Sequence, residues 1–319
     1  MRVVLLPPLT QALGRRTDAR RLSRRVARAR PLPPLPPGRL AQLEAFFGIE
    51  APELAWLAAV ADGLEEGTAW VRAEPVCVHV DIASLRLLAH GEGIGLSPQE
   101  ELPLFESLER WCGQRGIVAR RTAFCRWFLA PPSDWPSPES DPPERWLGRA
   151  LDWSWRAPRA PWSRLLAEIE MLFASHPLNL SRRQRGLSPV TGVWIWGGRR
   201  GEASPLRSAA REGIVISGDP LIQASARRLG MEAIPGLPDR PLRRVVLLDC
   251  ASGADEDPLA PPVPAEWWFG CGRRFAVGRL DFFCFWRRAG LADGEPNPAD
   301  ARLAAAATRR AGLFAGAEP

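Results

Sequence analysis

The segment from His176 to Gly198 places the strongest constraint on the fold, because small and polar residues stand there at fixed steps before a short apolar run. Apolar residues at helical spacing between 162 and 175 predict an amphipathic helix that leads into His176. Gly186 and Pro189 favour a loop after it. Residues 193–196, Val-Trp-Ile-Trp, indicate a buried strand that ends in a pair of glycines. The segment therefore predicts a helix, a loop and a strand in that order.

The polar residues of this segment are candidates for an anion site. Asn179 and Arg182 both donate hydrogen bonds, and arginine offers a planar fork that suits a carboxylate or a phosphate. His176 either caps the last carbonyls of the preceding helix or joins these two residues if the loop folds back. Gly197 and Gly198 open a glycine-rich loop that would suit a phosphate, although it matches neither a dinucleotide fingerprint nor a P-loop. These five residues are the predicted ligand-binding set.

The rest of the chain alternates strand and helix patterns. Short apolar runs predict strands at 3–6, 70–80, 213–217 and 244–249, and a helical pattern covers 219–229. Residues 40–63 are rich in alanine and leucine and indicate helix, and Ser97-Pro-Gln-Glu100 has the form of a capping box that begins a helix running to about Cys112. Residues 117–129 suggest two strands around Arg120–Arg121. We expect an α/β fold, with a mostly parallel sheet flanked by helices and an inserted smaller α+β lobe.

We expect one domain over residues 1–319, with three distinct segments in it. Residues 15–39 are rich in arginine and proline, and they read as an exposed helix followed by a stiff polyproline spacer. Six prolines between 131 and 143 indicate an irregular loop, where a lobe boundary could lie. Residues 300–319 are alanine-rich and predict a helix or a frayed tail.

The excess positive charge lies near the N-terminus. Residues 1–43 hold ten arginines against one acid, Asp18, whereas the whole chain carries a formal charge of +6. An arginine cluster supplies phosphate contacts, so nucleic-acid binding through residues 15–30 is one reading. No aromatic residue interleaves these arginines before Phe46, so base-stacking platforms are absent and a solvated helix face is the preferred reading.

Composition excludes several kinds of chemistry. The chain has no lysine and no tyrosine, which rules out Schiff-base, lysine-base and tyrosine-acid mechanisms. Its six cysteines form no Cys-x-x-Cys pair, so neither a zinc knuckle nor a thioredoxin-like site is expected. Only three histidines occur and no Gly-x-Ser-x-Gly elbow does, which argues against a serine triad. No run is long and apolar enough for a membrane helix, so we expect a cytoplasmic protein without membrane contact.

A resemblance to a known family starts from the same segment. His176-Pro-Leu-Asn179, followed by Arg182, Gly186 and Pro189, resembles the archaeal-type cofactor-independent phosphoglycerate mutases, whose stretch reads His-Pro-x-Asn-x-x-Arg-x-x-x-Gly-x-x-Pro-Ala-Asn. Residues 217–231 look like the next strand and helix of that family.

A more specific similarity is to the bacterial RpfE-type regulatory proteins, which are relatives of these mutases. They have Trp-x-Trp-Gly-Gly where this chain has Trp194 to Gly198, and an earlier Ala-Asp-Pro-Val-His-Leu where this chain has Ala73-Glu-Pro-Val-Cys77. The resemblance implies an alkaline-phosphatase-like α/β sheet.

The chain departs from the mutases at positions that the resemblance assigns to metal or phosphate. The mutases follow their first strand with an aspartate and a glycine, whereas residues 3–6 here lead into Pro7-Pro8. Thr191 replaces the second Asn of the motif, and Trp196 replaces an arginine. The late aspartate and histidine ligands have no counterpart after Asp249 except acids such as Asp255 and Asp257, which are weak metal candidates together with Asp249.

We therefore expect a non-catalytic regulatory or metabolite-binding protein on a mutase-like scaffold, with no catalytic residue and no cofactor. Its ligand would be a small acidic or phosphorylated metabolite, and no protein partner is identified. A metal-dependent phosphoglycerate mutase or phosphatase-like enzyme, with Mn²⁺ or Zn²⁺ in an atypical site, is one alternative. A nucleic-acid-associated protein is the other.

Overall fold

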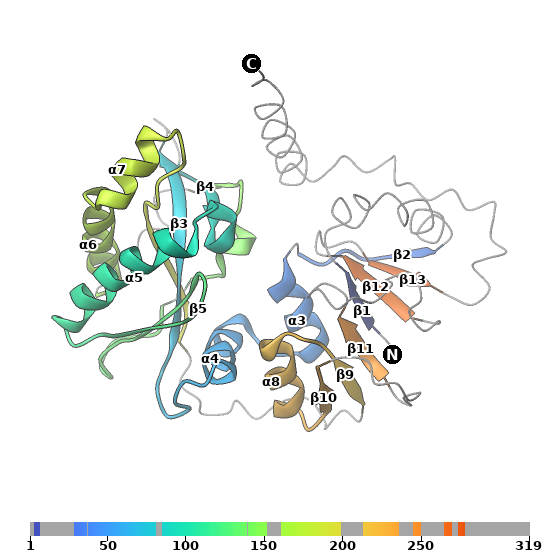
Figure 1. Ribbon diagram of the computed structural model, residues 1–319. Coiled ribbons are helices and arrows are strands. Elements are labelled where there is room, and N and C mark those ends of the chain that lie inside the picture. Colours follow the sequence, from blue (N-terminus) through green and yellow to red (C-terminus); the bar gives the residue numbers. More distant parts are fainter. Residues whose placement is uncertain are drawn as a thin grey trace, which may run out of the picture. The chain divides into compact units, whose positions relative to one another are not determined.

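The computed structural model divides the chain into two compact units (Figure 1). Unit 1 comprises Met1–Phe47 and Ala210–Pro319, and unit 2 comprises Gly48–Ala209. The structure describes residues 3–6, 29–36, 38–80, 85–138, 140–151, 161–198, 213–235, 245–249, 265–269 and 274–277. Most of the arginine cluster at 15–30 and the whole of 300–319 lie outside these ranges. Residues 131–143, the expected lobe boundary, belong to unit 2.

Unit 1 contains a seven-stranded sheet with the order β10-β9-β11-β1-β12-β13-β2. The four pairings from β10 to β12 are parallel, and the last two are antiparallel. The strands are β1 Val3–Leu6, β2 Arg30–Leu32, β9 Ile214–Ile216, β10 Glu232–Ile234, β11 Val245–Asp249, β12 Ala265–Phe269 and β13 Arg274–Val277.

Two helices of unit 1 are tied to each other at their N-terminal ends. These helices are α3, Arg39–Phe47, and α8, Pro220–Arg228. Asp219 caps α8 by accepting a hydrogen bond of 2.9 Å from the Leu221 N–H, and its second oxygen lies 3.1 Å from Nε of Arg39. Phe46 of α3 packs edge-on against Trp268. One aspartate thus begins α8 and fixes α3 beside it.

Unit 2 contains a six-stranded sheet whose pairings are all antiparallel in the part of the chain described. Its long central strand β3 pairs with β6, β4 and β8. The strands are β3 Val71–Val80, β4 Leu85–His90, β5 Val118–Ala123, β6 Arg126–Ala130, β7 Ala150–Leu151 and β8 Gly192–Gly197. The helices are α4 Ala51–Ala61, α5 Pro98–Gly113, α6 Trp162–Ala174 and α7 Pro177–Gln184, with short 3-10 turns η1 Gly91–Ile94 and η2 Pro143–Arg145.

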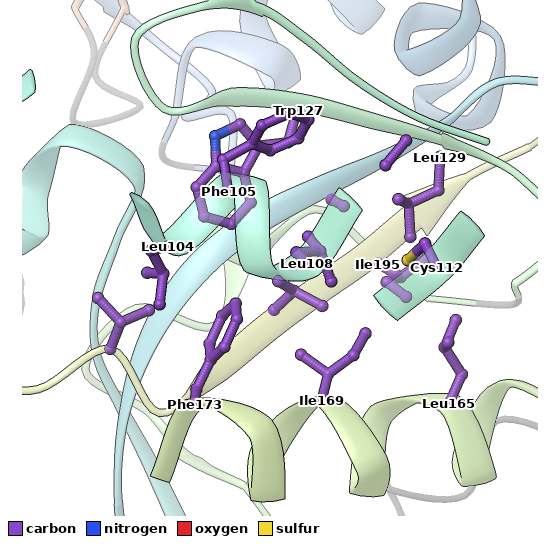
Figure 2. Close-up of a cluster of buried hydrophobic side chains, with 14 of the residues drawn as sticks. Leu104, Phe105, Leu108, Cys112, Trp127, Leu129, Leu165, Ile169, Phe173 and Ile195 are labelled. Carbon is purple, nitrogen blue, oxygen red and sulfur yellow. The ribbon is translucent and has the colours of Figure 1, made fainter. Parts of the chain in front are cut away.

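The core of unit 2 lies between this sheet and helices α5 and α6 (Figure 2). Leu165, Ile169 and Phe173 point from α6 towards Ile195 of β8, since spacings of four residues place them on one face. Burying each such side chain stabilises the fold by about 1.5–3 kcal/mol. The opposite face of β8 is covered too, because α4 packs against β8 and β3. All six residues of β8 are therefore buried.

The start of α5 follows the sequence prediction. The Ser97 hydroxyl accepts from the Glu100 N–H at 3.2 Å, and the Glu100 carboxylate accepts from the Ser97 N–H at 3.0 Å, which completes the capping box. The neighbouring Glu101 is fully buried. It accepts from the Trp127 indole and from Arg121, both at 2.6 Å, and so ties α5 to the β5–β6 hairpin.

The mixed α/β class is confirmed, whereas a mostly parallel sheet is found in unit 1 alone and is not supported for the described residues as a whole. Seven of the eleven strand pairings in the described residues are antiparallel. The parallel sheet is predicted from the apolar run at 3–6 and from the strand–helix–strand pattern at 213–249, and the strands there, β1, β9 and β11, do pair in parallel. The antiparallel pairings lie mainly in unit 2, where helices cover both faces of β8.

Three local expectations also change. Residues 40–63 form two helices rather than one, because Gly48 adopts a positive φ of 73° between them. The turn of the predicted strand pair falls at Phe124–Cys125, so Arg120 and Arg121 lie inside β5. Residues 177–184, expected as a loop, form α7. No helix in the described ranges is long and apolar enough to cross a membrane.

Candidate functional site

His176 begins helix α7 instead of capping the end of α6. Its Nδ1 accepts a hydrogen bond of 3.2 Å from the Leu178 N–H, so the imidazole acts as the N-cap. Its Nε2 lies 3.2 Å from the Ser107 hydroxyl on α5. Burial lowers the pKa of His176 below its ordinary value. Both ring nitrogens are therefore engaged by the chain itself.

Asn179 is completely buried and joins the end of α6 to the approach to β8. Its amide nitrogen donates to the carbonyls of Phe173 and Val190, both at 2.7 Å. Its amide oxygen accepts from the Val190 N–H at 2.8 Å. The side chain thus contacts three backbone groups: both groups of Val190, and the Phe173 carbonyl, which also accepts from the His176 N–H at 3.1 Å.

Arg182 lies one turn further along α7, and only 1% of its side chain is exposed. Its Nε donates to the Ser188 carbonyl at 2.8 Å, and its two terminal nitrogens donate to the carbonyls of Ile94 and Gly95 at 3.1 and 3.3 Å. Nη1 also lies 2.8 Å from Oε2 of Glu100, the capping-box residue of α5. Its charge is compensated inside the protein.

The structure therefore brings the predicted anion corner together but turns it inward. Asn179 and Arg182 occupy the buried face of α7, as a spacing of three residues requires. Together with His176, they fasten α7 to α5, η1 and the entrance of β8. We call this set the α7 clasp.

The two glycines after β8 are required by close packing. A Cβ on Gly197, where φ is +92°, would lie 2.3 Å from Cβ of Ala55 on α4. A Cβ on Gly198, where φ is +94°, would lie 2.8 Å from Val71 and 2.9 Å from Pro138. Glycine is thus required at both positions, because the φ angle is positive and because a side chain would clash. The remainder of the predicted phosphate loop, residues 199–201, lies outside the described residues.

The weak metal candidates are not assembled in the described part of the chain. Asp249 ends β11, while Asp255 and Asp257 lie outside the described residues. Within the described ranges, no three His, Cys, Asp or Glu side chains gather so that they could hold a metal ion.

Glu74 forms a buried charged cluster that sequence reasoning did not select. It lies on β3, and Oε2 is 2.9 Å from Nδ1 of His90 at the end of β4. Oε1 accepts from the Trp196 indole at 3.1 Å and lies 3.5 Å from Nε of Arg72. Arg72 in turn stacks over the Phe128 ring at 5.0 Å.

The charges of this cluster stabilise one another. Burial alone would raise the pKa of Glu74, but the hydrogen bond from His90, the charges of Arg72 and His90 and the Trp196 N–H lower it to about 2. Burial would lower the pKa of His90, but the hydrogen bond and charge of Glu74 raise it above its ordinary value. Glu74 and His90 thus form an ion pair over an intermediate pH range.

A cavity of about 570 Å³ opens where β3 begins and where β6 and β8 end. Residues 67–69 and 71 form one wall, residues 131–133 and 135–138 of the next loop form another, and Trp162 and Gly198 also line it. Trp135 meets Trp162 edge-on, with ring centroids 5.0 Å apart. Among the predicted site residues, Gly198 lines this cavity. In the sequence, the tryptophans and prolines of the loop were the residues that could have pointed to this cavity, but their spacing does not mark them as a site.

Comparisons with known proteins give distant structural neighbours. No family model matches the chain, and no curated protein does. A cofactor-independent phosphoglycerate mutase from Thermoplasma acidophilum DSM 1728 is similar over 86% of this chain and 88% of its own, with 14% identity and a TM-score of 0.36. The PH0037 protein from Pyrococcus horikoshii is similar over 73% of this chain and 60% of its own, with 11% identity and a TM-score of 0.36. Both solved structures are thus distant neighbours of this chain.

Proposed function

We propose that this protein is a non-catalytic binding or regulatory protein whose mutase-like motif holds the fold together. The observation that carries the proposal is the enclosure of Arg182. A catalytic or phosphate-binding arginine must present its guanidinium to a ligand, whereas this one contacts three carbonyls and the Glu100 carboxylate. The motif residues that are shared with the mutases therefore have a sufficient structural explanation.

The positions at which the chain departs from the mutase motif support the same view. Thr191 replaces an asparagine, and its hydroxyl accepts from the Val78 N–H at 2.9 Å and lies 3.2 Å from the Val76 carbonyl. Trp196 replaces an arginine, and its indole N–H contacts Glu74. Both replacements bind strand β8 to β3. Substitutions that exchange ligand-binding groups for contacts between strands are expected in a protein that has lost phosphoryl transfer.

The α7 clasp gives no support to an acidic or phosphorylated ligand at that position. Glu100 neutralises Arg182 and also pairs with Arg185, so an incoming phosphate would meet a carboxylate beside the arginine. We therefore propose that a metabolite sensor built on this fold would bind its ligand outside residues 176–182.

The test is a direct assay for catalysis by the full chain. Purified protein would be incubated with 3-phosphoglycerate or p-nitrophenyl phosphate in the presence of Mn²⁺ or Zn²⁺, and its metal content would be measured by mass spectrometry. The Thermoplasma acidophilum mutase would serve as the positive control. We expect no turnover above the blank. Stoichiometric metal, with turnover that is proportional to protein concentration, would overturn the proposal.

A further inference from the structure

We propose that helix α7 and the turn η1 form a pH-sensitive latch, which is closed near neutral pH and is released by both acid and alkali. Each element begins at a histidine, since His90 is the N-cap residue of η1 and His176 is that of α7. Arg182 joins them, because it donates from α7 to the carbonyls of Ile94 and Gly95 at the end of η1. The inference goes beyond the proposed function, because the latch needs neither a ligand nor a reaction.

His176 caps α7 only while its imidazole is neutral. Its Nδ1 accepts a hydrogen bond of 3.2 Å from the Leu178 N–H, so the proton of the neutral ring lies on Nε2, which faces the Ser107 hydroxyl at 3.2 Å. A second proton on the ring would occupy Nδ1, and two donors would then face each other. Acid should therefore remove the cap at the start of α7.

The surroundings of His176 favour the neutral ring. Burial lowers the pKa of His176, and the Pro103 carbonyl on α5, which favours the charged ring, offsets this only in part. The charged residues of α5 beside this contact, Glu106, Glu109 and Arg110, are exposed, and the last turn of α6 carries no titratable side chain. Because the folded-state pKa lies below the ordinary value of 6.5, the cap is complete above about pH 6.5 and is lost as the pH falls through the folded-state value.

His90 holds the start of η1 best while its imidazole is charged, because Nδ1 lies 2.9 Å from Oε2 of Glu74. The charges that act on His90 come from Glu74 and Arg72 on β3 and from Glu144 on η2; η1 adds the exposed Glu92, and β7 adds none. Burial alone would lower the pKa of His90, but the hydrogen bond and the charge of Glu74 raise it above the ordinary value of 6.5. The ion pair is therefore complete below about pH 6.5 and weakens as the pH rises through the folded-state value.

The two histidines thus respond in opposite directions, and Arg182 couples them. Protonation of His176 loosens the helix that carries Arg182, whereas deprotonation of His90 loosens the turn whose carbonyls accept from it. Either change weakens the same set of hydrogen bonds. The latch should therefore be tightest near pH 6.5, where both contributions are nearly complete.

The experiment is hydrogen exchange of the full chain, followed by mass spectrometry at about pH 5, 6.5 and 8.5 and corrected for the intrinsic pH dependence of amide exchange. Peptides from α7 and η1 report the latch, and peptides from the β5–β6 hairpin report the unfolding of unit 2. His176→Asn keeps an acceptor at the N-cap but does not titrate. His90→Gln keeps an N–H donor for Glu74 without the charge. His79→Gln, at an exposed position of β3, is the matched control.

We expect the protection of α7 and η1 in the wild type to fall about threefold or more from pH 6.5 to pH 5, and about twofold or more from pH 6.5 to pH 8.5. Both elements should exchange faster than the hairpin at these two extremes. His176→Asn should lose only the acid response, His90→Gln should lose only the alkaline response, and His79→Gln should keep both.

The proposal is overturned if either response is missing in the wild type, if a response persists in the variant that should remove it, or if α7 and η1 exchange only as fast as the hairpin. In the last case, release would be the unfolding of the whole unit. Circular dichroism would establish that the variants are folded. His176→Ser, which also supplies an N-cap acceptor, and His90→Asn would replace a variant that does not fold and would be judged by the same criteria.

Discussion

Replacing Arg182 with alanine should destabilise unit 2 strongly, because the side chain is almost fully buried and joins α7 to α5 and η1. Breaking a buried ion pair by removing one partner costs about 3–5 kcal/mol. The three hydrogen bonds to carbonyls contribute about 1 kcal/mol each, but water that enters the vacated space would replace part of them. Glu100 keeps the Ser97 N–H and Arg185 as partners, which lowers the total. We therefore expect a loss of about 3–5 kcal/mol.

Urea unfolding followed by tryptophan fluorescence is a suitable assay, since eleven of the fourteen tryptophans belong to unit 2. For a unit of this size the same loss would lower the thermal midpoint by on the order of 10 °C. Arg183→Ala is the matched control, because Arg183 is the neighbouring residue of the same helix and is exposed. It should change stability by less than about 0.5 kcal/mol.

The reasoning would be refuted if Arg182→Ala and Arg183→Ala unfolded at the same urea concentration. Arg182 would then not hold α7 in place, and its guanidinium would be available for a ligand. An intact fold combined with the loss of binding to 3-phosphoglycerate would restore the anion site that the sequence suggested.

Three further predictions concern the Glu74 cluster, the clasp and the glycine pair. Because the pKa of Glu74 falls from 4.5 to about 2, its contribution of about 3 kcal/mol should be present above pH 4.5 and lost as the pH falls towards 2. The raised pKa of His90 means that its contribution is full below about pH 6.5 and is lost as the pH rises through the folded-state value. The free energy of unfolding in urea should therefore differ most between wild type and His90→Gln from about pH 4.5 to pH 6.5. Asn179→Ala should cost roughly 2–4 kcal/mol in the same assay, because the Val190 N–H and carbonyl lose their partner and the Phe173 carbonyl loses one of its donors; a cost below about 1 kcal/mol would contradict this. Gly197→Ala should destabilise the protein more than Gly186→Ala, since both have positive φ but only the first would clash, and equal midpoints in thermal melting would count against the clash with α4.

The sequence was sufficient to predict those helix starts and strands that depend on residues close together in the chain. The capping box at Ser97–Glu100 and the start of α5 depend on residues three apart, and the strands β3 and β8 depend on their own apolar patterns. Helix α7 was missed because serine, asparagine and arginine next to a proline look like a loop. Its polar face is stabilised by distant partners such as Ile94 and Glu100, which no local pattern reveals.

The charged cluster could not be predicted for a similar reason. Glu74 meets His90 because β3 and β4 pair in a register that shifts between Cys77 and Val78. A one-residue change of register would send the side chains of one strand to the opposite face. The residues Ala73 to Cys77 were noted for their resemblance to a family motif, yet their sequence alone does not give this register.

The second edge of β8 has a consequence for strand pairing with other chains. Strand β8, with the sequence Gly-Val-Trp-Ile-Trp-Gly, pairs with β3 on one edge, and no described strand pairs with the other. An uncharged, tryptophan-rich edge of this kind is a template for joining a second chain. Two hydroxyls of the proline-rich loop 131–143 contact carbonyls here: Ser140 donates to the Ile195 carbonyl within β8, and Ser137 donates to the Gly198 carbonyl just after it. Prolines lack the N–H groups needed to extend a sheet, so this loop is a poor template for a further strand beside β8.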